Sequence, residues 1–189
     1  MQRFGPITMR KTVRNASFSG ARMGICTGLA LLAGRMIVAG DPLQPLRFAA
    51  ALFLGDRIDE TDTEIGSVVA IGLAVHLTLS VFYGLLYFWI HRLWSGHEMP
   101  PPGRRALSGA LFGLVVWLLD FHLFAPLLRP WLVHGPALIE AFLHVVLFGI
   151  PLALLIGVSE RRAGLAQRWR KELGDLRRRL RPPRSPGCP

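Results

Sequence analysis

Long apolar runs with almost no charge dominate the pattern of this chain. Residues 65–90 contain no Asp, Glu, Lys or Arg, and the runs at residues 106–128 and 136–158 contain one acidic residue each. About 20 apolar residues suffice for one helix to cross a bilayer. A weaker apolar run covers residues 22–40. We therefore predict an all-α polytopic membrane protein with four transmembrane helices.

A shorter apolar stretch lies between the first two predicted spans. Residues 48–55 are too few to cross a bilayer. Pro42 and Pro45 precede this stretch and Gly55 ends it, a pattern typical of a short helix. We predict a helix that lies at the membrane interface or re-enters the membrane from the outer face.

The residues after the fourth span predict an amphipathic helix. Its apolar stripe, with spacings of four, four, three and four, consists of Leu165, Trp169, Leu173, Leu176 and Leu180. The basic residues around it are Arg168, Arg170, Lys171, Arg177, Arg178 and Arg179. We predict that these residues and Trp169 bind anionic lipid head groups at the cytoplasmic leaflet. Docking to a partner protein is the alternative.

The charge distribution predicts the domain organisation and the orientation. The chain has 22 basic and 12 acidic residues, and its basic residues gather in an N-terminal arm at residues 1–21 and a tail at residues 159–189. Residues 41–64 carry six acidic residues against two arginines. Because Lys and Arg favour the cytoplasmic side, we place both termini of the transmembrane domain, residues 22–158, in the cytoplasm. The chain has a high pI because of the basic residues in these two terminal segments. These lie beside a membrane, where anionic lipid is the nearer partner, so we predict no nucleic-acid partner.

Two glycine stripes predict close helix packing. Gly20, Gly24 and Gly28 are spaced by four in the first span, and Gly109 and Gly113 repeat that spacing in the third. Both stripes lie at predicted cytoplasmic ends, so we expect them to be in contact. A homodimer or larger membrane complex held at these glycines is the alternative.

The two halves of the chain resemble each other weakly. Each half pairs a glycine-striped helix with a helix that carries His-x-x-Leu, at His76 in the first half and His144 in the second. Such an echo indicates a parallel repeat about an axis normal to the membrane. We expect Pro151 to kink the fourth helix and to free the carbonyl group of Leu147.

Six ionisable residues from all four spans form a predicted polar cluster. They are Arg35, His76, Asp120, His122, Glu140 and His144. At about 1.5 Å of rise per residue, all six lie within about 16 Å of the outer helix ends. Ionisable residues inside a membrane are costly, which makes them candidates for function. Asp120 and His122 are two residues apart, so they cannot both face one point of an ideal helix.

Three interpretations of this cluster stay open. The first is a hydrogen-bonded core in which Arg35 pairs with Asp120 or Glu140. The second is a haem or transition-metal site built from His76 and His144 with the two acidic residues. The third is a proton or ion path that uses histidine titration near neutral pH.

Several short motifs resemble those of a known group of proteins. These are the stretch Gly-Asp-Pro-Leu-Gln-Pro-Leu-Arg at residues 40–47, Val75-His76 followed by Ser80-x-x-Tyr83-Gly84, and Phe142-Leu143-His144 with Phe148-Gly149. The chain is similar in these motifs to small four-helix inner-membrane proteins of proteobacteria that have no assigned function. That group usually has Asn-Phe where this chain has Asp120-Phe121. The resemblance implies architecture and a bacterial inner-membrane location, and it implies no activity.

Catalytic motifs contribute nothing to the interpretation. The sequence contains no phosphate-binding loop, nucleophile elbow or zinc-protease motif. We therefore predict a non-enzymatic accessory or structural membrane component without a cofactor. The alternatives are a haem- or metal-binding membrane protein and a small proton- or ion-conducting protein.

Overall fold

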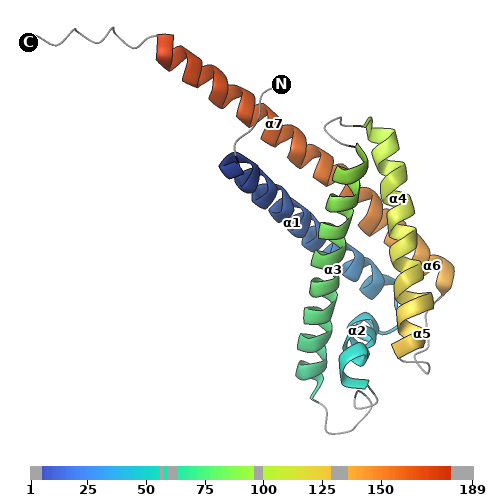
Figure 1. Ribbon diagram of the computed structural model, residues 1–189. Coiled ribbons are helices and arrows are strands. Elements are labelled where there is room, and N and C mark those ends of the chain that lie inside the picture. Colours follow the sequence, from blue (N-terminus) through green and yellow to red (C-terminus); the bar gives the residue numbers. More distant parts are fainter. Residues whose placement is uncertain (1–5, 56–57, 59–63, 96–99, 129–135, 180–189) are drawn as a thin grey trace, which may run out of the picture. The chain divides into compact units, whose positions relative to one another are not determined.

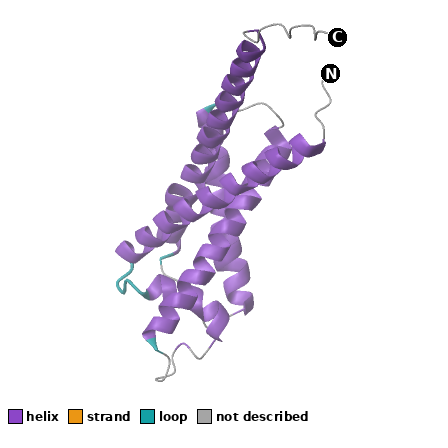
Figure 2. Cartoon of the chain, turned by 90° about the vertical axis from the view of Figure 1, so that its left-hand side faces the viewer, coloured by secondary structure: helices purple, strands orange, loops and turns teal. Residues whose placement is uncertain are grey.

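The regular structure of the protein is helical in every part that can be described. The computed structural model describes residues 6–55, 58, 64–95, 100–128 and 136–179, and these contain helices, short turns and no strand (Figure 2). Four helical stretches are long and apolar enough to cross a membrane: Phe18–Val38, Ile65–Trp94, Pro102–Leu127 and Ala137–Arg178. The predicted all-α fold with four transmembrane helices is confirmed.

The elements follow one another in a simple order (Figure 1). They are α1 (Pro6–Val38), α2 (Gln44–Leu54), α3 (Ile65–Ser95), α4 (Pro102–Leu118), η2 (Leu119–Phe124), α5 (Ala125–Leu128), α6 (Ala137–Leu143), η3 (His144–Gly149) and α7 (Ile150–Arg179). The third span consists of α4, η2 and α5, and the fourth begins with α6 and η3 and continues into α7. By its contacts the chain divides into two units, Met1–Gly157 and Val158–Pro189.

Two spans change helical form in the middle, and both do so just before a proline. The segments η2 and η3 are π-helical, each six residues long, and Pro126 and Pro151 follow them by two residues. A proline in a helix donates no N–H and crowds the preceding turn. A local wide turn relieves that crowding inside a membrane. A π segment thus precedes both Pro126 and Pro151, whereas the kink at Pro151 and the free carbonyl group of Leu147 stay predictions.

The glycine stripes pack against two different helices, so the prediction that they contact each other is wrong. An added Cβ at Gly24 would lie 3.0 Å from the Cα of Gly84 in α3. One at Gly113 would lie 2.5 Å from the carbonyl oxygen of His144, and one at Gly149 would lie 2.9 Å from the Cα of Gly113. Each stripe faces the helix that carries a matching glycine. These surfaces are therefore occupied within the chain.

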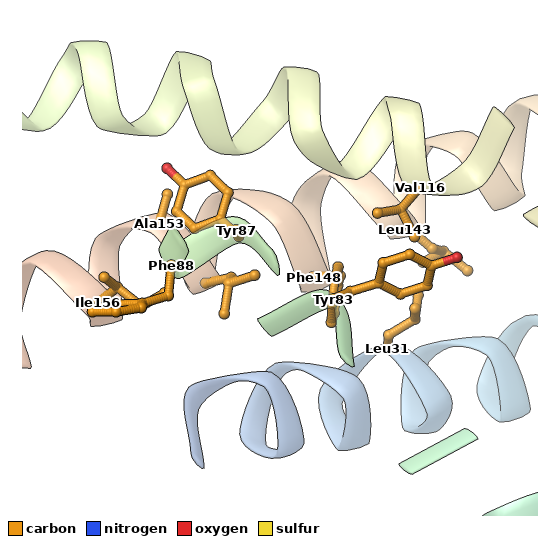
Figure 3. Close-up of a cluster of buried hydrophobic side chains, with 10 residues drawn as sticks. Leu31, Tyr83, Tyr87, Phe88, Val116, Leu143, Phe148, Ala153 and Ile156 are labelled. Atoms are coloured by element: carbon orange, nitrogen blue, oxygen red, sulfur yellow. The ribbon is translucent and has the colours of Figure 1, made fainter. Parts of the chain in front are cut away.

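The apolar core of the first unit lies between the paired helices (Figure 3). Its buried members are Leu31, Tyr83, Tyr87, Phe88, Val116, Leu143, Phe148, Leu152, Ala153 and Ile156. They come from α1, α3, α4, α6, η3 and the start of α7, so every span contributes. The hydroxyl oxygens of Tyr83 and Tyr87 need polar partners in this apolar surrounding, and each has one on the third span.

Helix α2 is packed against α3 through its alanine-rich face. Its buried residues are Pro45, Leu46, Ala49, Ala50 and Ala51, and the backbone of Leu46 lies directly against Gly72. Before the helix, Asp41 accepts a hydrogen bond from the N–H of Leu43 (2.9 Å) and pairs with Arg47 (2.9 Å). After it, Gly55 has a φ of 65°, which favours glycine. The predicted short helix is thus present between the first two spans.

The second unit contains the C-terminal part of α7, where the amphipathic stripe was predicted. Leu165, Trp169, Leu173 and Leu176 are each more than half exposed. Arg168, Arg170, Lys171, Arg177 and Arg178 are exposed as well. Leu180 and the side chain of Arg179 lie outside the described residues. The helical form of this segment agrees with the sequence pattern.

The contact between α1 and α3 can be tested by replacing two glycines of α3 with alanine. One substitution should lower thermal stability and the other should not. In Gly84→Ala, the new Cβ would lie 2.5 Å from the carbonyl oxygen of Gly20 and 2.7 Å from the Cα of Gly24. Because both neighbours are backbone, the helices must separate, at a cost of about 1–3 kcal/mol. The control is Gly66→Ala at the start of α3, where nothing lies within 4 Å of the new Cβ.

We expect thermal unfolding in one detergent to show a lower midpoint for Gly84→Ala. The midpoint for Gly66→Ala should be unchanged or higher, because alanine favours helix more than glycine does. Equal midpoints for the two variants would contradict the close packing of α1 on α3.

Candidate functional site

Four of the six predicted cluster residues line one cavity. The cavity has a volume of about 480 Å³, and its polar lining includes Arg35 of α1, His76 of α3, Asp120 of η2 and His144 of η3. These residues come from all four spans, as the sequence pattern predicted. Glu140 reaches the same place indirectly, through Arg35.

Arg35 forms the central charge contact of the cluster. Its Nε atom lies 2.8 Å from Oε2 of Glu140, and the two side chains are only 10% and 14% exposed. The two atoms lie at ion-pair distance without the alignment of a hydrogen bond. Of the two carboxylates predicted as partners of Arg35, Glu140 is the one that pairs with it. This contact joins the first span to the fourth.

The guanidinium group of Arg35 also lies against two aromatic rings. Its Cζ atom is 5.5 Å from the ring centroid of Phe48 and 5.3 Å from that of Phe121. The two rings are stacked, with centroids 5.0 Å apart. Such contacts stabilise a cation. Phe48 of α2 thus connects the short helix to the charged centre, a role that its place in an apolar run did not reveal.

Asp120 has a different partner, Tyr83. The Tyr83 hydroxyl donates a hydrogen bond to Oδ1 of Asp120, with 2.5 Å between the oxygens. Tyr83 is buried in α3, so this bond joins the second span to the third. The sequence pattern did not assign Tyr83 to the cluster, because only residues that carry or gain charge near neutral pH were expected there. The motif Ser80-x-x-Tyr83-Gly84 was the available signal.

The two cavity histidines both donate to backbone carbonyl groups. Nε2 of His76 lies 2.8 Å from the carbonyl oxygen of Gly28, and Nδ1 of His144 lies 2.7 Å from that of Glu140. A carbonyl oxygen only accepts, so these nitrogens carry the protons. The other ring nitrogens, Nδ1 of His76 and Nε2 of His144, have no hydrogen-bond partner in the described part of the chain.

His122 is separate from the cluster. It is exposed and lies edge-on against Trp117, with ring centroids 4.7 Å apart. Its neighbour Asp120 lines the cavity. The two residues therefore face different directions, as their spacing predicted, and only Asp120 contributes to the cavity.

The rest of the cavity wall is apolar and rich in aromatic residues. Helix α2 supplies Phe48, Ala49 and Leu52. Three lining residues, Thr78 and Phe82 of α3 and Phe124 of η2, are themselves exposed. The wall of the cavity therefore reaches the surface of the transmembrane spans at α3 and η2.

A second polar group lies elsewhere in the first unit, around Arg105 of α4. Arg105 is only 3% exposed, and its guanidinium group occupies the space beside Gly157, since an added Cβ there would lie 2.6 Å from Cζ. Nearby, the hydroxyl groups of Tyr87 and Ser108 are 2.8 Å apart. The absence of a side chain at Gly157 makes the burial of Arg105 feasible.

The described side chains form no cluster that could ligate a metal ion. Within residues 6–55, 64–95, 100–128 and 136–179, no group of three or more His, Cys, Asp or Glu side chains is suitably placed to hold a metal ion. A haem held by two axial histidines alone stays a prediction.

Comparisons with known proteins add no further assignment. No family model, no curated protein and no solved structure matches this chain.

The ion pair between Arg35 and Glu140 can be tested by a double-mutant cycle. Arg35→Met leaves a carboxylate unpaired in a largely buried place, as Glu140→Gln does for the guanidinium group. Breaking a buried pair from one side costs about 3–5 kcal/mol. We expect each single variant to lose stability in thermal unfolding, and the double variant to recover a large part of the loss.

A residue outside the cavity provides the control. His122 is exposed and does not line the cavity, so the effects of Arg35→Met and His122→Ala should add more closely. If the losses of Arg35→Met and Glu140→Gln simply add, the pair contributes nothing to stability and the assignment fails.

Proposed function

We propose that this integral membrane protein is a non-enzymatic component of a bacterial inner membrane, built around a polar cluster that holds its four spans together. One observation carries the proposal: three polar contacts connect all four spans. They are Arg35 with Glu140, His76 with the carbonyl group of Gly28, and Tyr83 with Asp120.

The use of these groups supports a structural role over a catalytic one. The strongest charges neutralise each other, Asp120 accepts from Tyr83, and one ring nitrogen of each cavity histidine donates to a backbone carbonyl group, so each of these groups already contributes to packing of the spans. Polar contacts between transmembrane helices stabilise their association when they replace unsatisfied groups in lipid.

The proposed orientation rests on charge. The basic arm and the basic tail place both termini in the cytoplasm under the positive-inside rule, and the acidic residues 41–64 then lie outside. In this orientation the cluster occupies the outer half of the membrane, and α2 lies beside it.

The proposed partners are lipids. The exposed stripe Leu165, Trp169, Leu173 and Leu176, with basic residues around it, has the pattern of a helix that lies on an anionic leaflet. A homodimer or larger membrane complex stays an alternative. Its contact surface would lie outside the glycine stripes, because these pack within the chain.

The haem and metal alternatives are tested by the purified protein itself. We expect an absorption spectrum without a Soret band and no stoichiometric metal.

His76→Ala removes a hydrogen bond between α3 and α1, so it should lower the thermal midpoint. The loss should correspond to about 0.5–1.5 kcal/mol, the net contribution of one hydrogen bond, because the Gly28 carbonyl group keeps its partner within α1.

His122→Ala is the matched control for that variant, because His122 is exposed and outside the cavity. It should leave the midpoint nearly unchanged. A Soret band that His76→Ala or His144→Ala removes would overturn the structural role in favour of haem binding.

The tail is tested with a peptide of residues 160–181. We expect it to be unstructured in buffer and helical on anionic vesicles, with a blue shift of Trp169 fluorescence and weaker binding at high salt. Replacing Arg168, Arg170 and Lys171 with glutamine should weaken binding by roughly tenfold or more. Replacing Trp169 and Leu173 with serine should remove the blue shift. A peptide that stays unfolded on anionic vesicles would refute the surface helix and favour a protein partner.

A further inference from the structure

The cavity has the size and composition of a small-molecule site. Its volume of about 480 Å³ lies within the roughly 300–1,000 Å³ typical of such sites. Its wall is mostly apolar, with a few polar groups, which is the usual composition. Because exposed residues of α3 and η2 on the surface of the transmembrane spans form part of its wall, a ligand would enter from the lipid. The ligand must therefore be lipid-soluble.

The unpaired polar atoms define the functional group that the ligand carries. The two terminal amino groups of Arg35 have no hydrogen-bond acceptor in the described part of the chain. Nδ1 of His76 and Nε2 of His144 lack a donor there. A hydroxyl group meets both needs, since it accepts from a guanidinium group and donates to a neutral imidazole.

The charges in the cavity disfavour an ionic ligand. Glu140 already neutralises Arg35, and Asp120 is a second carboxylic acid. A carboxylate or phosphate ligand would enter without a free positive charge to pair with it, at a high cost in a low-dielectric place. A cation would have to compete with the hydroxyl group of Tyr83 for Asp120. The ligand is therefore neutral.

The rings around the polar atoms favour a planar head group. Phe48 and Phe121 are stacked beside Arg35, and the ring of Phe121 stands edge-on to His144 at 5.6 Å. Phe82, Phe124 and Phe148 line the same cavity. Aromatic rings pack well against one another in stacked and edge-on arrangements.

We propose that this cavity binds a neutral, lipid-soluble molecule with a planar, hydroxyl-bearing aromatic head, the chemistry of a quinol. The head lies among Arg35, His76 and His144, and the apolar chain leaves between α3 and η2 into the bilayer. This binding activity goes beyond the structural role proposed above and does not depend on it, or on the orientation of the protein in the membrane.

The test measures equilibrium binding to the full-length protein in lipid nanodiscs. The probe is decylhydroquinone kept reduced, and its dimethyl ether is the matched ligand without hydroxyl donors. We expect saturable binding of the hydroquinone, with the ether at least about tenfold weaker, since one lost hydrogen bond is worth about that factor. Decanoate, which has the same chain length and an anionic head, should bind more weakly than the hydroquinone.

Two pairs of variants locate the binding. Leu52→Trp fills the cavity from α2, and Phe53→Trp places the same side chain on the exposed face of that helix. Thr78→Trp narrows the opening, and Ala74→Trp is its control one turn earlier in α3, outside the lining. We expect Leu52→Trp and Thr78→Trp to weaken binding at least about tenfold, by steric exclusion. Both controls should bind like the unchanged protein.

Each outcome is decisive because Thr78 lies at an exposed position. Thermal unfolding checks that a variant is folded, and if Leu52→Trp does not fold, Thr78→Trp alone decides. Equal binding of the hydroquinone and its ether, binding that Thr78→Trp leaves unchanged, or tighter binding of decanoate would each overturn the proposal.

Discussion

A charge inside a membrane must be neutralised by the protein itself, and here the pair of Arg35 and Glu140 meets that constraint. The two side chains are only 10% and 14% exposed, so water solvates neither charge well and the position of each depends on the other. The pair joins the first span to the fourth, and α2 brings Phe48 against the guanidinium group. His76 and Tyr83 each bind a partner on a neighbouring span, so the positions of all four spans depend on one another.

Close backbone contact and polar contact depend on each other in this protein. Gly28 leaves room for the side chain of Ser80, one turn after His76, whose ring donates to the Gly28 carbonyl group, and Gly113 leaves room for the backbone of His144. In each half, the glycine-striped helix thus meets the helix that carries the histidine. The weak echo in the sequence corresponds to this shared local arrangement. A bulkier residue at either stripe would move a histidine as well as separate two helices.

Much of the architecture could be predicted from the sequence, and the missing parts have identifiable physical reasons. The apolar runs predicted the four spans because length and hydropathy alone determine what crosses a bilayer, and the cavity residues Arg35, His76, Asp120 and His144 came from the cost of burying ionisable groups. Pairing was left open between Asp120 and Glu140, although Glu140 lies closer than Asp120 to the depth of Arg35 when residues are counted from the outer helix ends. The glycine stripes indicated which surfaces pack closely, but not which helix packs against each of them. The π segments could not be predicted, because apolar periodicity carries no signal for a locally wider turn.

The two π segments have a consequence for the rotational phase of their helices. Each residue of an ordinary helix turns the chain by about 100°, so the wide turns at η2 and η3 offset the residues after them by a fraction of a turn. The buried positions of the third span show this offset, since Gly109, Gly113 and Val116 follow one another after three or four residues and the next, Phe121, comes after five. The wide turn thus accommodates one extra residue without turning the helix after it away from the cavity.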